Sequence, residues 1–130
     1  MTKLMPRDKL AKLGKLARLR EKGALARFQH ICVQTNAIDE AIRSLSISGG
    51  EMLPNKDDLA ASSMFEKWCE WRDQKLKTLW KERSTLSLLE KEARRIAADE
   101  LGRRRVIDEI GNRMTRRAME MEKRRLHYPD

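Results

Sequence analysis

Residues 46–55, SISGGEMLPN, contain the only clear interruption of helical pattern in this 130-residue chain. The Gly-Gly pair can end a helix in a left-handed conformation, and Asn55 is a good N-cap for a second helix. Prolines occur only at positions 6, 54 and 129, so two long proline-free segments flank the break. We therefore predict a helix at about 6–48, a loop at about 49–55 and a helix at about 56–127.

Apolar residues on both sides of the break recur at alternating intervals of three and four. Spacing that averages 3.5 residues places side chains on one helical seam, as in a coiled coil. The first segment has Phe28, Ile31, Thr35, Ile38, Ile42 and Leu45 on such a grid, and the second has Leu79, Leu86, Leu89, Ala93, Ile96, Ile107, Ile110, Met114 and Met121. Lys75, Glu82, Glu100 and Arg103 also fall on the second grid and predict an uneven seam.

Two helices joined by a short loop predict an all-α antiparallel coiled-coil hairpin, which we take as one domain spanning 1–130. If residue 48 faces residue 56, the numbers of facing residues add up to about 104. The first helix then ends opposite residue 98, and the longer second helix continues for about 30 residues, or about 45 Å. Val106, Ile107, Ile110, Met114, Ala118 and Met121 would then lack an intramolecular partner.

Composition leans away from a β-protein, an α/β enzyme and a disulfide scaffold. Charged residues make up 38% of the chain and the formal net charge is +9, which is more charge than an average globular domain carries. Ala, Glu, Lys, Leu and Arg together account for 69 residues, a share typical of long helices. Residues 1–30 have a net charge of +7 and residues 101–130 of +4, so a hairpin would be basic at the end that carries both termini.

Little in the sequence indicates an enzyme or a cofactor. His30 and His127 are the only histidines, no phosphate-binding or dinucleotide motif occurs, and a two-helix hairpin offers no obvious concave pocket. We expect no catalytic residue, metal or cofactor. Cys32 and Cys69 have numbers that add up to 101, so a redox clasp is conceivable, although two free thiols in a reducing cytoplasm are favoured.

Two other features have alternative interpretations. Phe65, Trp68, Trp71 and Trp80 could stack on bases, but packing is favoured, with Trp80 facing Gly23 and Ala24. The basic-leucine segment 9–20 could lie on a membrane. Its leucines, however, recur every three residues, so they do not stay on one side of the helix and overlap the side that carries the basic residues. No apolar run reaches the length of a membrane span, and the N-terminus lacks the features of a signal peptide.

Arginines beside the uncovered apolar stripe are the most informative pattern. A basic and apolar helix face of this kind suits an acidic, partly apolar protein partner. The predicted partner-binding residues are Arg103, Arg104, Arg105, Ile107, Ile110, Met114, Arg116, Arg117 and Met121.

The chain resembles the FliJ/YscO-like stalk proteins of flagellar and type III secretion export machines. The resemblance covers the two-helix architecture, the basic-leucine opening at Leu10 to Arg20, the segments Leu88–Arg95 and Gly102–Ile110, and the basic tail from Arg113 to Arg125. It implies a non-enzymatic antiparallel coiled coil that inserts into a hexameric export ATPase. It also implies contacts with the membrane export gate or with export chaperones, hence a cytoplasmic protein that is peripheral to an inner-membrane complex.

Two alternatives remain open at the level of sequence. One is a basic helical nucleic-acid-binding protein, and the other is a dimeric coiled-coil scaffold in which the overhangs of two chains pair.

Overall fold

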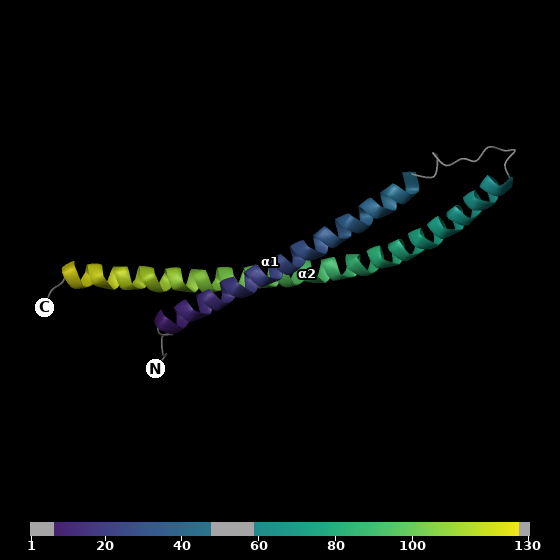
Figure 1. Cartoon of the computed structure of the whole chain (residues 1–130). Helices are drawn as coiled ribbons and strands as arrows, with labels where there is room; N and C mark the ends of the chain where they lie inside the picture. The colour runs from purple at the N-terminus through teal and green to yellow at the C-terminus, as the bar shows by residue number, and fades with distance from the viewer. Residues whose placement is uncertain (1–6, 48–58, 128–130) are drawn as a thin grey trace. The chain divides into compact units, whose positions relative to one another are not determined.

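The computed structural model describes residues 7–47 and 59–127, and both ranges are helical. Helix α1 spans Arg7–Ile47 with 41 residues, and helix α2 spans Leu59–His127 with 69 residues (Figure 1). These bounds agree with the predicted ranges 6–48 and 56–127 to within three residues. The predicted loop at 49–55 and the N-cap at Asn55 lie outside the described residues.

Local sequence explains why both helices are long. Neither contains a proline, and each is rich in strong helix formers. Asp8 lies in the first turn of α1, where a negative charge favours the positive end of the helix dipole. Arg124, Arg125 and His127 lie in the last turn of α2, where positive charge is favourable.

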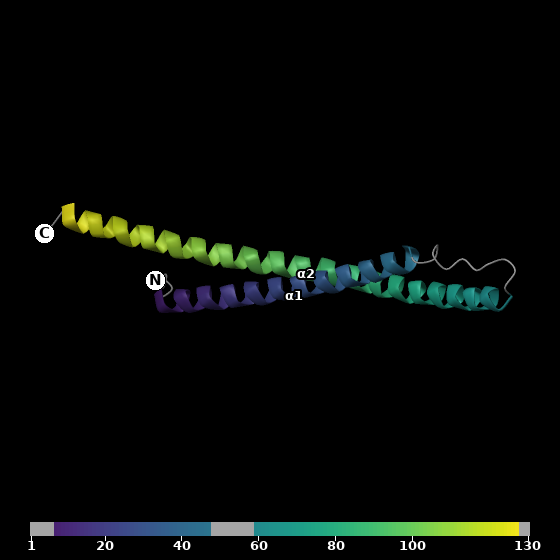
Figure 2. The ribbon, with the colours of Figure 1, turned by 45° about the horizontal axis from the view of Figure 1, so that its top comes forward.

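The two helices pack against each other in opposite directions, which confirms the predicted all-α hairpin. Figure 2 shows the pair from a second direction, with α2 the longer helix. Contacts within the hairpin group into two compact units. Unit 1 consists of Met1–Arg27 with Ala93–Asp130, and unit 2 consists of Phe28–Glu92.

The two units have chemically different cores. In unit 2 the buried residues include branched aliphatic side chains, namely Ile31, Ile42 and Leu79. In unit 1 the buried apolar residues are Ala17, Ala93 and Ala97, and Glu100 is only 8% exposed. The core of unit 1 thus combines small apolar side chains with a buried charge.

The seam of α1 follows the predicted grid and extends it. The predicted positions from Phe28 to Leu45 are all buried or half-buried. The same alternation of three and four residues continues towards the N-terminus through Leu10, Gly14, Ala17, Glu21 and Ala24, which are also buried or half-buried. The sequence argument weighed large apolar residues and so missed a seam made of small ones.

The seam of α2 agrees with the predicted grid at only half of its positions. At every second position, the residue that faces α1 is the one that follows the predicted residue. The predicted residues Leu79, Leu86, Ala93, Ile107 and Met114 are buried or half-buried. The alternate positions, however, are Leu76, Arg83, Glu90, Ala97, Arg104 and Gly111 in place of Lys75, Glu82, Leu89, Ile96, Arg103 and Ile110. Leu89 and Ile110 are 40% and 41% exposed, and Met121 is 72% exposed.

The predicted register is wrong by about 17 residues. A Cβ atom at Gly111 would lie 3.5 Å from Leu10 Cδ2, so these two positions face each other and their numbers add up to 121. In unit 2, Arg83 Nε donates to Asp39 Oδ1 at 2.7 Å, and these numbers add up to 122. Pairing the helices outward from the loop ignored the charged and small residues, which match across the seam only in this register.

This register changes the predicted overhang. Because the numbers of facing residues add up to about 121, Arg7, the first residue of α1, lies opposite about residue 114. Ile107 and Met114 are therefore covered by α1 and are half-buried, contrary to the prediction. Only the last dozen or so residues of α2 extend beyond the start of α1. At its other end, α2 begins well before the residues that face the end of α1.

The register also excludes the redox clasp between the two cysteines, which the sequence left conceivable but did not favour, and it contradicts the predicted packing of Trp80. Cys32 and Cys69 are both free thiols, and the register near 121 places Cys32 opposite residue 89. Twenty residues of helix, about 30 Å, separate that point from Cys69, so a disulfide cannot form within the hairpin. Trp80 is 56% exposed and does not fill the predicted space over small residues.

Candidate protein-binding site

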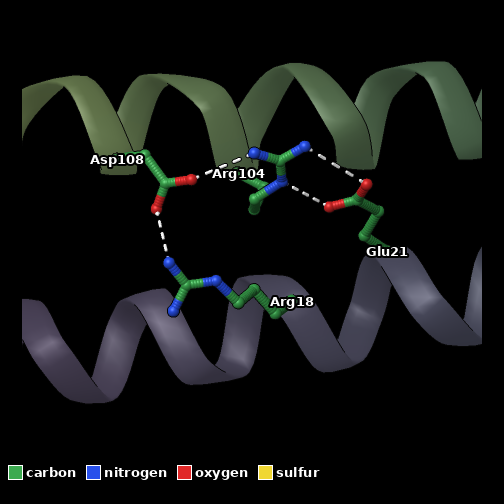
Figure 3. A network of polar contacts seen from close by, with 4 residues as sticks. All are labelled: Arg18, Glu21, Arg104 and Asp108. Atoms are coloured by element: carbon green, nitrogen blue, oxygen red, sulfur yellow. Dashed lines mark hydrogen bonds and ion pairs between the residues drawn. The ribbon is translucent and has the colours of Figure 1, made fainter.

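A cross-helix network of charged side chains forms the centre of unit 1 (Figure 3). Arg104 Nε donates to Glu21 Oε2 at 2.6 Å and its Nη1 donates to Asp108 Oδ2 at 3.0 Å. Arg18 Nη2 donates to the other oxygen of Asp108 at 3.2 Å. Two residues of α1 and two of α2 are thus linked in one chain of ion pairs, which fixes their relative positions.

The guanidinium of Arg104 is the branch point of this network. Its hydrogen bonds to Glu21 and, second, to Asp108 raise the pKa of Arg104 above its ordinary value. The side chains of Glu21 and Arg104 are 15% and 27% exposed, so the pair is screened less than an ion pair in open water. Arg104 therefore acts as a permanent cation within the helix–helix contact.

Glu100 extends the network along α2. It is 8% exposed, and such a carboxylate requires partners. Arg103 Nη1 donates to Glu100 Oε1 at 3.3 Å, and Arg20 Nε lies 3.6 Å from the same oxygen. Of the charged residues that made the predicted seam uneven, Glu100 is thus paired with two arginines.

The predicted partner-binding residues divide into two groups. Arg104, Ile107 and Met114 are half-buried residues of the intramolecular seam. Arg103, Arg105, Arg116, Arg117 and Met121 are exposed, and Ile110 is partly exposed at the edge of the seam. The second group is therefore more accessible to a partner than the first, whose members expose only part of their surface.

Net charge is distributed very unequally between the two units. The described residues of unit 1 contain 19 basic and eight acidic side chains, a net charge of +11. Those of unit 2 contain eight of each and are neutral. Unit 1 therefore attracts negatively charged partners over distances of about a Debye length, ~10 Å at 0.1 M salt.

Unit 1 also has an open groove of about 690 Å³. Its apolar surface comes from Leu10, Gly14, Ile107, Gly111 and Met114, and we call this feature the glycine groove. Arg7, Lys15, Arg18 and Asp108 are the charged residues among those that line it. The sequence predicted no concave pocket of the kind that an active site needs, and it gave no prediction of this open groove in unit 1. Glycine at two seam positions, 14 on α1 and 111 on α2, is the sequence signal that could have located it.

Searches of the described residues for two other kinds of site gave no candidate. Histidine, cysteine and acidic side chains nowhere form a group of three or more that could hold a metal ion within 7–47 and 59–127. In the same ranges, neither helix contains an apolar stretch that could cross a membrane.

Comparison with known proteins gave no match: no family model, no curated protein and no solved structure is significantly similar to this chain. The features of the chain that bear on function are therefore its own residues, above all the charge and the exposed side chains of unit 1.

Proposed function

We propose that this protein is a non-enzymatic coiled-coil stalk of a flagellar or type III protein-export machine. In this role the hairpin inserts into the ring of a hexameric export ATPase and contacts the export gate or export chaperones. It acts in the cytoplasm, peripheral to the inner-membrane complex and held there through protein contacts.

One observation carries the proposal: the net positive charge of the described hairpin lies entirely in unit 1, the unit that contains the end of the longer helix. There Arg116, Arg117 and Met121 are exposed, beyond the residues of α2 that face the start of α1. Basic side chains speed association with an acidic surface, and an exposed apolar side chain contributes affinity once it is buried.

A binding assay with the export ATPase purified from the same host tests this function. We expect the variant Arg105→Glu/Arg116→Glu/Arg117→Glu to lose binding and to impair secretion while it keeps its helicity. Arg103 and Arg104 are left unchanged in this variant, because Arg103 pairs with the buried Glu100 and Arg104 holds the hairpin together. The matched control is Lys67→Glu/Lys75→Glu/Lys77→Glu, which reverses three exposed charges in unit 2 and should bind normally. The proposal would be refuted if the ATPase did not bind the unaltered protein.

The charge of unit 1 also favours one alternative, a nucleic-acid-binding protein, because Lys and Arg side chains bind phosphates whatever the sequence. We rank it second because the described aromatic residues available for stacking on bases, Phe28, Phe65, Trp68, Trp71 and Trp80, all lie in unit 2 and not in the basic unit.

A further inference from the structure

We propose that the glycine groove of unit 1 binds an acidic amphipathic helix of a partner protein. This inference goes beyond the proposed function, because it concerns a different surface and holds for any machine in which the hairpin works.

The two glycines of the groove are not required by the packing of α1 on α2. A Cβ atom at Gly14 would meet its nearest neighbours, one of them Ile107 Cγ2, at 4.0 Å, and one at Gly111 would lie 3.5 Å from Leu10 Cδ2. Both are ordinary van der Waals contacts. Neither glycine has a positive φ, so the backbone does not require glycine either. What the missing side chains do provide is space in the groove.

The groove has the chemistry of a helix-binding surface. Its floor is apolar, formed by Leu10, Ile107 and Met114 around the two glycines. The residues that line it on α1 run from Arg7 to Arg18, about 16 Å of helix, which matches about three turns of a partner helix. A helix that lays an apolar face into such a groove between two others buries that face on both sides.

The charged residues that line the groove indicate that the partner helix is negatively charged. Three cations, Arg7, Lys15 and Arg18, line the groove against one carboxylate, Asp108. Asp108 is already held by Arg18 and Arg104, whereas Arg7 and Lys15 make no ion pair with any described residue. Acidic side chains that flank the apolar face of a partner helix would meet these two cations.

Other occupants fit this groove less well. A second copy of unit 1 would bring two net charges of +11 together. A nucleic acid backbone would meet the cations but would leave the apolar floor without a complementary surface. A membrane surface is nearly flat and does not enter a groove between two helices.

The test uses the full-length protein and a labelled three-heptad peptide, with leucine at positions a and d and glutamate elsewhere. A peptide with lysine in place of glutamate is the charge control. We expect the unaltered protein to bind the glutamate peptide and not the lysine peptide. Gly14→Ala/Gly111→Ala should weaken binding by at least about tenfold, which is the effect of one well-packed contact.

A second pair of glycines in the same two helices provides the matched control. An added Cβ atom would meet nothing within 4 Å at Gly23 or at Gly102, and neither residue lines the groove. Both alanine pairs should raise the melting temperature, because alanine favours a helix over glycine. Only the groove pair should lose peptide affinity, so a gain in stability accompanied by a loss of binding identifies the groove as the site.

Reversal of charge separates the rim of the groove from the general field of unit 1. Arg7→Glu/Lys15→Glu should abolish binding of the glutamate peptide, whereas Lys9→Glu/Lys12→Glu changes the net charge equally at exposed positions outside the groove. The proposal is overturned if both charge variants weaken binding alike, if both alanine pairs behave alike, or if the unaltered protein does not bind the glutamate peptide.

Discussion

Arg104 shows how far a residue's role depends on its neighbours across the seam. On sequence grounds it belongs to an arginine run that reaches a partner, together with Arg103 and Arg105. In the folded chain its guanidinium joins Glu21 and Asp108, and its side chain is 27% exposed, whereas both neighbouring arginines are exposed. A one-residue difference in helical phase decides between a binding residue and a structural one.

We therefore predict that Arg104→Met lowers the melting temperature and that Arg105→Met does not. The first substitution leaves Glu21, whose side chain is 15% exposed, without its hydrogen bonds to Arg104. Thermal unfolding followed by circular dichroism measures the difference, which should shrink at high salt because ion pairs are screened. Equal melting temperatures for the two variants at low salt would contradict a structural role.

The pH dependence of this contribution follows from the sign of the pKa shift. The pKa of Arg104 is raised in the folded state, so its stabilising effect is fully present below the unfolded pKa. It is lost only as pH rises through the folded value, which lies in strongly alkaline solution. The difference between the Arg104→Met variant and the unaltered protein should therefore stay constant across the neutral range.

At the scale of the helices, sequence predicted more of the fold than of its packing. Proline positions and the spacing of apolar residues sufficed to predict two long helices, because the formation of a helix in a proline-free segment is a local property. The register was not predictable from large apolar residues alone. It depends on the facing pairs Leu10–Gly111 and Glu21–Arg104, in which a glycine or a charge carries the information. The predicted binding residues were affected in the same way, since Ile107 proved to be covered by α1.

The sequence pattern placed two leucines, Leu79 and Leu89, on the seam of α2, but the structure buries them to different extents. Leu79 is 7% exposed and Leu89 is 40% exposed. We predict that Leu79→Ala lowers the free energy of unfolding by about 2 kcal/mol, the lower end for a buried leucine. Leu89→Ala should lower it by no more than about half as much, since less apolar area leaves water at that site. Urea titrations of both variants measure these changes, and equal losses would restore the predicted grid.

Cross-linking tests the register directly. In a Cys32→Ser/Cys69→Ser background, we predict that Leu10→Cys/Gly111→Cys forms a disulfide readily on oxidation, because these positions face each other. Leu10→Cys/Arg94→Cys follows the rejected register and should not, because 17 residues of helix, about 26 Å, separate residue 94 from residue 111. Mobility on a non-reducing gel distinguishes the two, and a bridge to position 94 would restore the register of 104.

At the scale of the whole molecule, the two units differ in their cores and in their charge. Unit 2 has the larger buried side chains and no net charge, whereas unit 1 has a core of small residues and a net charge of +11. Like charges repel, so the carboxylates of the unit 1 network reduce the cost of gathering so many arginines on two adjacent helices. A bound acidic partner would reduce it further, which is why partner binding should also stabilise the hairpin.

The same charge makes nucleic acid the main competing partner, and salt dependence decides between them. Duplex binding by Lys and Arg releases counterions, so log K falls with log salt by about 0.9 for each phosphate neutralised. We predict that this protein binds duplex DNA weakly at low salt, without sequence preference, and that binding disappears near physiological salt. Neither long helix shows a feature that places it in a groove to read base edges.

Fluorescence anisotropy with labelled duplexes of two unrelated sequences, across a salt series, measures this directly. The Arg116→Glu/Arg117→Glu variant should show a shallower slope than the unaltered protein, because it removes two phosphate contacts. The glutamate peptide should be affected less steeply by salt than the duplex, because part of its affinity comes from apolar contact with the groove. If duplex binding instead persists at physiological salt and displaces the peptide, unit 1 is a nucleic-acid surface and the stalk proposal falls with it.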